Sequence, residues 1–342
     1  MLVATLDRPR DAAGTVHWLE AGMLLTRRQA LSGLGSLSLM GANTRPTFAA
    51  SPVTLVEPYG LNSSTGDAAA LLRPALSVKL GSPVEIQHIA GDAGGAALRR
   101  VSASAPDGTT LLVTQLLSPY SENRADDPNA PSYQKMTAIG LLTGPISTAL
   151  VVSHASGITD WAAFEKRAHE GKLRMAHNPI LLFALPLGML EAHFSQRFSD
   201  VLASTRAEVI AALDQDKADA GFLPTISLLT VDRRPPLRPI LTFGGERASW
   251  FPDVPTFREV GKGERTAITG AIAVFGPRGM SAAAQATVLQ AVREAGGDAS
   301  VTAAASALRY PLEIKGPEEL VAAMDRNVRV IRDMRQYLRA PT

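Results

Sequence analysis

The chain contains no cysteine among its 342 residues. Disulfides, thiolate metal ligands and cysteine nucleophiles are therefore excluded, and a chain without thiols suits an oxidising compartment. Long apolar runs are also lacking. The longest, Leu31–Met40 and Ile180–Leu187, fall well short of the roughly 20 residues that a membrane-spanning helix needs. We therefore expect the processed protein to be soluble.

The sequence also lacks the usual motifs of catalysis and cofactor binding. It has no Gly-x-Ser-x-Gly elbow and no phosphate loop of the Gly-Lys-Ser/Thr type. The segment Gly91–Gly95 does not have the glycine spacing of a dinucleotide fingerprint. The six histidines show no spacing typical of metal ligands; they are His17, His88, His154, His169, His177 and His193. We predict no catalytic residue, no metal and no cofactor.

Charge is balanced once the first fifty residues are set aside. The whole chain has 34 Lys and Arg against 32 Asp and Glu, and beyond residue 50 the two classes number 29 each. A neutral chain without a block of like charges has no electrostatic footprint for nucleic acid or an anionic membrane. We expect neither as a partner.

The pair Arg27-Arg28 lies in a segment typical of a twin-arginine export leader. It stands within Thr26–Leu31 and precedes the mildly apolar run Leu31–Met40. The small residues that end Thr47–Ala50 suit cleavage by a signal peptidase. We interpret residues 1–50 as a cleavable leader, with Met23 as an alternative start, that delivers the protein to the periplasm. Such a leader takes no part in the fold.

From residue 53 onward, short strand-like runs alternate with longer helical ones, which is typical of α/β units with mostly parallel sheets. About 290 residues exceed the usual size of one hydrophobic core, so we expect two lobes. The strand candidates are 53–56, 84–87, 111–113, 149–152, 237–243 and 272–275. Helices are expected from Asp67 to Leu80, after the N-caps Thr159 and Ser281, and from Pro317 onward, where an apolar stripe predicts a buried face.

Two segments are far more specific. Ala105–Leu112 is an Ala-Pro-Asp-Gly turn that leads into a strand, with Asp107 as a turn residue, and Phe251–Gly261 is a Pro-Asp turn that leads into a short helix. Both closely resemble signatures of the extracytoplasmic solute receptors of tripartite tricarboxylate transporters, the Bug family. Pro58-Tyr59, Gly91–Gly95 and Gly316–Glu319 are similar to further family segments and follow the same order. The resemblance covers essentially everything after the leader.

The resemblance implies an α/β periplasmic-binding-protein fold of two lobes that close on a small carboxylate, each a mostly parallel sheet flanked by helices. We expect lobe 1 to comprise 51–147 and 273–342, and lobe 2 to comprise 148–272. The loops 59–65 and 91–95 lie between strand ends and helix starts, where backbone N–H groups favour an anion. We expect these N–H groups to be its main donors. The candidate ligand-binding residues are Tyr59, Asn62, Ser63, Ser64, Thr65, Asp67, Ala93, Gly94, Gly95, Thr114, Gln115, His177, Asn178, Ser204, Thr205 and Arg206.

The second lobe departs from the family pattern. Asn178–Phe183 replaces a small, polar helix start, and Leu202–Arg206 replaces a Pro-Tyr-Lys-Gly-like loop. The added apolar bulk predicts a shift away from compact, heavily hydroxylated acids. Arg206 is either a bidentate partner for a second carboxylate or a solvated arginine at a helix start.

These observations predict a receptor rather than an enzyme. It would bind a small organic acid unchanged and deliver it to the membrane subunits of a tripartite transporter, and we expect it to be a monomer. Two alternatives stay open: a sensor that docks onto a signalling partner, and a hydrolase on a binding-protein scaffold.

Overall fold

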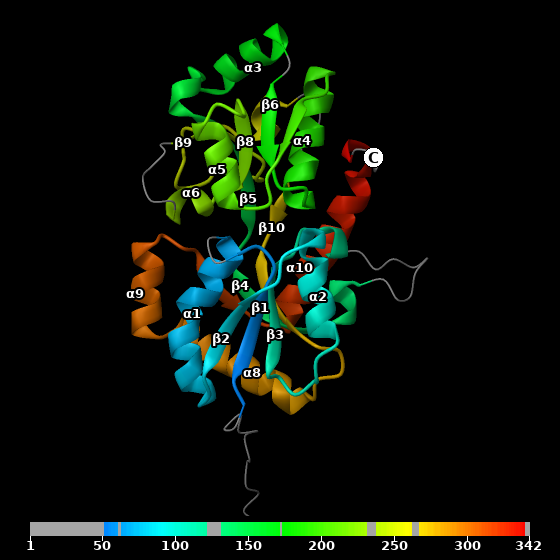
Figure 1. Ribbon diagram of the computed structural model, residues 1–342, viewed down its shortest axis with the longest axis vertical. Helices are drawn as coiled ribbons and strands as arrows, with labels where there is room; N and C mark the ends of the chain where they lie inside the picture. The colour runs from blue at the N-terminus through cyan, green and yellow to red at the C-terminus, as the bar shows by residue number, and fades with distance from the viewer. Residues whose placement is uncertain are drawn as a thin grey trace, which may run out of the picture. The chain divides into compact units, whose positions relative to one another are not determined.

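Two β-sheets with helices on their faces make up the protein (Figure 1). The computed structural model describes residues 51–60, 63–121, 131–171, 173–230, 237–261 and 267–338. The predicted leader, with Met23 and Arg27-Arg28, lies outside the described residues, and so does Asn62.

The strands are β1 (Val53–Glu57), β2 (Val84–His88), β3 (Thr110–Gln115), β4 (Thr137–Thr143), β5 (Ile146–Ser153), β6 (Arg174–His177), β7 (Ser199–Leu202), β8 (Ala220–Pro224), β9 (Leu237–Thr242), β10 (Thr269–Gly270), β11 (Ile272–Gly276) and β12 (Leu312–Lys315). The α-helices are α1 (Ser64–Leu80), α2 (Gly95–Ser102), α3 (Trp161–Glu170), α4 (Leu181–Phe194), α5 (Arg206–Asp214), α6 (Ser227–Thr230), α7 (Phe257–Val260), α8 (Ala282–Gly296), α9 (Ala299–Ala307) and α10 (Pro317–Asp333). Short 3-10 helices occupy Asp92–Gly94, Pro119–Ser121, Tyr133–Lys135, His154–Ser156 and Arg335–Tyr337.

The first sheet has the strand order β12-β4-β11-β3-β1-β2. Its central strands are buried on both faces, because α1 and α8 pack on one face and α2 and α10 on the other. Leu72 and Leu76 of α1 belong to the first of these cores, and Leu98 of α2 and Leu320 of α10 belong to the second. Strand β1 lies between β2 and β3 and runs parallel to both.

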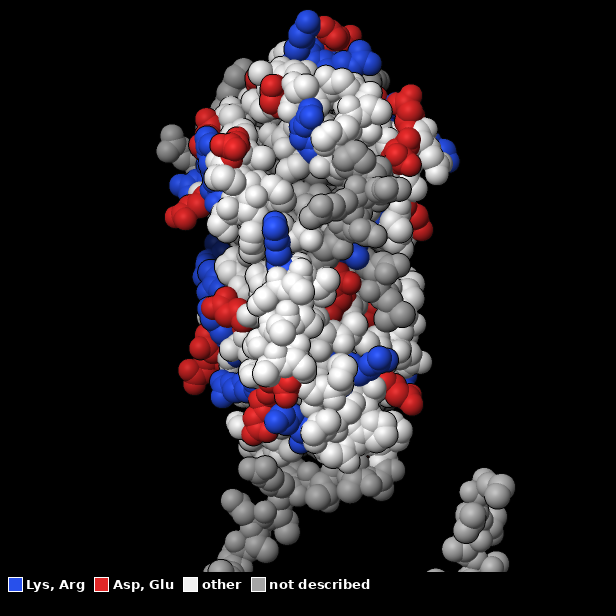
Figure 2. Space-filling view, turned by 90° about the vertical axis from the view of Figure 1, so that its left-hand side faces the viewer, with Lys and Arg blue, Asp and Glu red and all other residues white. Residues whose placement is uncertain are grey.

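The second sheet has the order β10-β5-β8-β6-β7, with β9 paired to β5. One of its cores contains α3 and α4, through aromatic side chains such as Phe164 and Phe194. Another contains Val209 and Leu213 of α5. On the face in Figure 2, positive and negative side chains are interspersed, as the balanced composition leads one to expect.

Both sheets are mixed, which corrects the prediction of mostly parallel sheets. Four pairings of the described strands are parallel and six are antiparallel. The reason lies in how the chain changes sheets. It passes from β4 to β5 through residues 144–145 and from β10 to β11 through Ala271. The strands at these two crossings run antiparallel to each other. Antiparallel neighbours do not need the helical crossover that parallel neighbours require.

Helix α10 contributes to the cores of both sheets. Leu320 and Met324 pack with the first sheet, whereas Ile331 and Met334 pack with the second. The prediction of a buried stripe on this helix is therefore confirmed. We predict two lobes, 51–147 with 273–342 and 148–272; that they move as separate bodies stays a proposal.

Most of the predicted helix ends agree with the structure. Ser281 caps α8 by accepting the N–H of Ala284 at 3.2 Å, and α10 starts at Pro317. The predicted N-cap Thr159 is wrong by one position: Asp160 caps α3 by accepting the N–H of Ala163 at 2.9 Å. A carboxylate at the cap also favours the positive end of the helix dipole.

Candidate functional site

The loop after β1 is built around a buried carboxylate that sequence reasoning missed. Glu57, the last residue of β1, has an exposed fraction of 0%. Its two oxygens accept the backbone N–H groups of Tyr59 and Gly60, each at 2.9 Å. Nδ1 of His88 lies 2.8 Å from Oε1. Two backbone donors that we expected to hold a ligand therefore hold Glu57 instead.

The start of α1 lies next to this carboxylate. Ser63 caps the helix, and its Oγ accepts the N–H of Gly66 at 3.0 Å. The hydroxyls of Ser63 and Thr65 lie 2.8 Å apart and approach Oε2 of Glu57 at 3.5 and 3.4 Å. The helix runs for 17 residues, so its first turn presents the positive end of a full macrodipole.

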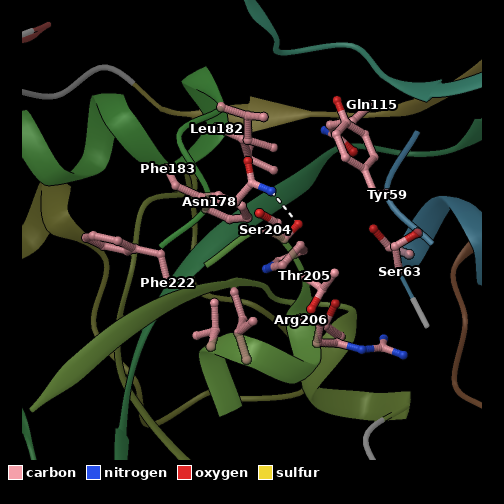
Figure 3. Close-up of a pocket in the computed structure, with 16 residues that line it drawn as sticks. Tyr59, Ser63, Gln115, Asn178, Leu182, Phe183, Ser204, Thr205, Arg206 and Phe222 are labelled. Carbon is pink, nitrogen blue, oxygen red and sulfur yellow. Dashed lines mark hydrogen bonds between the residues drawn. The ribbon is translucent and has the colours of Figure 1, made fainter. Parts of the chain in front are cut away.

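A cavity of about 60 Å³ lies beside this helix start, between segments of the two sheets (Figure 3). One water needs roughly 10–15 Å³ by such a measure, so there is room for several. Eight predicted site residues line the cavity: Tyr59, Ser63, Ser64, Gln115, Asn178, Ser204, Thr205 and Arg206.

Gln115 is the most unusual residue of the cavity. It ends β3 and has an exposed fraction of only 3%. Neither its Nε2 nor its Oε1 has a hydrogen-bond partner in the described structure. A Cβ at Gly270 would lie 1.8 Å from Nε2, so the glycine makes room for the amide. A buried amide with both atoms unpaired is costly unless something else binds it.

The second sheet contributes polar groups from two strand-to-helix loops. Nδ2 of Asn178 donates to the carbonyl of Ser204 at 2.7 Å, which ties the loops after β6 and β7 together. Thr205 caps α5 by accepting the N–H of Glu208 at 3.2 Å. Ser204 and Thr205, which the family resemblance selected, lie just after the end of β7.

Arg206, which lines the cavity, forms an ion pair with Asp67 of α1. Its Nη1 lies 3.0 Å from Oδ2 of Asp67, and the two side chains are only 13% and 19% exposed. The pair joins a residue of the first-sheet segment to one of the second. Of the two readings from sequence, a solvated arginine does not match this burial.

The other predicted residues that the structure describes are absent from the cavity lining. His177 is 5% exposed and lies between the carbonyl of Asn178 (3.2 Å) and Asp200 (3.1 Å), which is a structural arrangement. Thr114 is fully buried with its hydroxyl 3.0 Å from that of Tyr133. Thr65 and Asp67 act through their neighbours, as described above.

The second loop, with Ala93, Gly94 and Gly95, does not reach the cavity either. Tyr120 covers it and donates to the carbonyl of Asp92 at 2.8 Å. The backbone of Gly91 to Gly94 has positive φ throughout, with Asp92 at 51° and Ala93 at 47°. Such a conformation is strained for residues other than glycine.

Half of the cavity wall was missed at the sequence level. The additional residues are mostly apolar and come from the start of α4, from α5, from β8 and from the start of α6: Ile180, Leu182, Phe183, Val209, Phe222, Leu223, Pro224 and Ser227. The apolar run Ile180–Leu187 was the available signal for the first three. Phe222 and Leu223 gave none, because buried strand residues look alike whether or not they face a ligand.

Tyr59 forms an aromatic part of the wall. Burial raises the pKa of its hydroxyl well above the ordinary 10.0, and neighbouring Tyr133 adds to the shift. The hydroxyl donates to the carbonyl of Ala93 at 3.4 Å. Tyr59 is therefore neutral, and its polar end points under the second loop.

Two further features concern only the described ranges. They contain no cluster of three His, Asp or Glu side chains that could hold a metal ion. None of their helices has the length and apolar character needed to cross a membrane.

Comparison with known proteins decides the family. Residues 69–330 match the model of the tripartite tricarboxylate transporter family receptor. The chain belongs to this receptor family. The predicted resemblance is confirmed over most of the chain that follows the expected leader.

Relatives of this receptor support the assignment. BugT of Bordetella pertussis is 24% identical over 272 residues, which cover 75% of this chain and 80% of that protein. Among solved structures, MatC of Rhodopseudomonas palustris with bound malate has a TM-score of 0.70 and 23% identity, and the match covers 84% of this chain and 99% of that one. The periplasmic binding protein BugD has a TM-score of 0.72 and 16% identity, with 83% and 98% covered. These likenesses confirm the predicted periplasmic-binding-protein fold.

Proposed function

We propose that this receptor captures a small organic carboxylate in the cavity beside the start of α1 and releases it unchanged. The observation that carries the proposal is Gln115, whose buried amide has no hydrogen-bond partner among the described residues. It lies in the same cavity as Ser63 and Ser64 of the helix start. A carboxylate there would meet the positive end of the helix and could accept from Nε2 of Gln115.

Related structures support a carboxylate as the ligand class. MatC was solved with malate, and a second R. palustris protein, with a TM-score of 0.72 and 17% identity over 85% of this chain, was solved with adipate. The family is described as a transporter receptor. We accordingly propose that the partners of this chain are the membrane subunits of a tripartite transporter. Recovery of those subunits from membranes by the ligand-bound receptor, and not by the empty one, would test this.

Ligand binding would bring together the two parts of the chain that contain the first and the second sheet. The cavity takes its wall from both of them, and the Arg206–Asp67 pair joins them at 3.0 Å. A ligand between them adds contacts to both sides at once. Lobes that move separately would then close on the acid and reopen after delivery.

Calorimetry of residues 51–342 against a panel of small acids tests the proposal. Failure of every acid to bind would overturn it. The sharper test is Gln115→Leu. Replacement of an unpaired buried amide by an apolar group of similar shape is neutral or stabilising, so the empty variant should unfold at the same temperature as the parent or above it, yet bind the acid more weakly.

A matched control uses the same substitution at an exposed site. Gln290 lies on α8, where its amide donates to Glu294 at 2.7 Å. Gln290→Leu should leave acid binding unchanged. Equal binding by Gln115→Leu and Gln290→Leu would show that the amide does not serve the ligand.

Export to the periplasm through a twin-arginine leader is part of the same proposal. The sequence that supports this is the pair Arg27-Arg28 ahead of the apolar run Leu31–Met40. Replacement of both by lysine should abolish delivery to the periplasm. Undiminished delivery would overturn the twin-arginine assignment and leave the receptor function intact.

A further inference from the structure

Arg206 is the one charged side chain among the described residues that line the cavity. Its guanidinium is already engaged, because Oδ2 of Asp67 lies 3.0 Å from Nη1 and both side chains are largely buried. A ligand carboxylate that reached Arg206 would have to compete with Asp67. The pair therefore brings almost no net charge to the site.

A second carboxylate lies behind the start of α1. Glu57 is fully buried, and its Oε2 lies 3.5 Å from Oγ of Ser63, which lines the cavity. It already accepts the N–H groups of Tyr59 and Gly60. The helix start thus already lies beside one buried carboxyl group before a ligand adds its own.

Beyond the polar groups of Asn178, Ser204 and Thr205, one part of the cavity wall is apolar. Figure 3 shows Leu182, Phe183 and Phe222 on the side away from Ser63 and Gln115. Their exposed fractions are 1%, 6% and 0%. A charged group placed against this wall would lose its water without gaining a partner.

We propose that the ligand is a monocarboxylic acid with an uncharged, apolar body. Its carboxylate lies at the start of α1 and Gln115, and its body lies against Leu182, Phe183 and Phe222. This inference rests on the proposed carboxylate-receptor function and restricts it: dicarboxylates such as those bound by the malate and adipate structures would be poor ligands for this chain.

Matched acids of equal carbon skeleton provide the test. Calorimetry of residues 51–342 would compare butanoate with succinate, hexanoate with adipate, and 4-methylbenzoate with terephthalate, with hexanamide as the uncharged reference. In each pair of which a member binds, the monoacid should bind about tenfold more tightly or better, the ratio that corresponds to one unpaired charged group. Tighter binding of a diacid would overturn the inference and leave the receptor function standing. If no acid binds, or if hexanamide binds as tightly as hexanoate, the proposed function itself is overturned.

Removal of the Asp67 carboxylate from Arg206 should weaken the preference for the monoacid. Asp67→Asn removes the competing carboxylate, so the affinity for adipate relative to hexanoate should rise about tenfold or more. Asp216→Asn is the matched control: Asp216 pairs with Arg174 at 2.9 Å, is 92% exposed and has positive φ, which asparagine tolerates. The control should keep the parent preference. An Asp67→Asn variant that binds with the parent ratio would overturn the role assigned to the ion pair.

Discussion

Replacement of the buried carboxylate by an amide, Glu57→Gln, tests whether Glu57 organises the loop after β1. The substitution keeps the side-chain volume and exchanges one oxygen for a donor. Oε1 accepts from Gly60, with the ring of His88 also at 2.8 Å, and Oε2 accepts from Tyr59. Whichever oxygen is lost, one backbone N–H then faces an NH₂ group.

The expected cost follows from this geometry. The hydroxyls of Ser63 and Thr65 can rotate to accept a hydrogen bond from the new amide, but a backbone N–H cannot. At least one buried donor is therefore left unsatisfied, which costs about 1–3 kcal/mol of stability. The remaining hydrogen bonds weaken because their acceptor loses its charge. A total of about 2–4 kcal/mol is reasonable, which for a chain of this size lowers the unfolding temperature by about 4–12 °C.

Thermal unfolding followed by circular dichroism would measure the effect. The matched control is Glu85→Gln on the neighbouring strand β2, where the side chain is exposed; it should change the unfolding temperature little. An unfolding temperature for Glu57→Gln within about 1 °C of the parent would refute the reasoning. The loop would then be held by something other than this carboxylate.

Three further predictions concern two glycines and one exposed ion pair. Gly188→Ala should destabilise the protein by about 1–3 kcal/mol despite the better helix propensity of alanine, because its Cβ would lie 1.8 Å from a backbone oxygen, that of Tyr337; an unchanged melting temperature would contradict this. In Gly270→Ala the new methyl group would instead contact the end of the Gln115 side chain. This variant should bind the acid about tenfold more weakly in calorimetry, and its melting temperature should fall less than that of Gly188→Ala. Unaltered binding would count against the role of Gln115. Hydrogen bonds from Arg247 lower the pKa of Glu259 from 4.5 to about 2. A carboxyl group with a lowered pKa stabilises the fold above pH 4.5, and this stabilisation is lost as the pH falls toward 2. Glu259→Gln should therefore lose less melting temperature than the parent between about pH 6 and pH 3, although the pair is exposed and the difference small; equal losses would show that the pair contributes nothing.

Strand prediction from sequence worked where the apolar run was long enough to stand out. The six predicted strands all occur, for example β1 and β11. Strands such as β6 (Arg174–His177) and β7 (Ser199–Leu202) were missed, because four residues of mixed polarity carry no local β signal. Their pairing with each other and with β8 produces them, since strand formation depends strongly on the neighbours that a strand meets.

The candidate site was predictable to a similar degree. Loops that follow strands and precede helices led to Ser63 and Ser64, and the family resemblance led to Ser204 and Thr205; all four line the cavity. The same rule also selected Ala93 to Gly95, which Tyr120 covers. The rule identifies the edge of a sheet at which a ligand can bind, but it does not say which of the loops at that edge line the cavity.

Local motifs and composition were enough to predict the family, the α/β class and the absence of thiol chemistry. The charges of the site could be assigned only from the folded chain. In the sequence Glu57 looks like an ordinary strand residue, and only the folded loop buries it. Arg206 looks like a free cation in the sequence, but in the structure Asp67, 139 residues away, lies within 3.0 Å of it. Long-range contacts of this kind leave no periodic or local trace. The burial that makes Gln115 an unpaired amide exists only once β3 and Gly270 lie side by side.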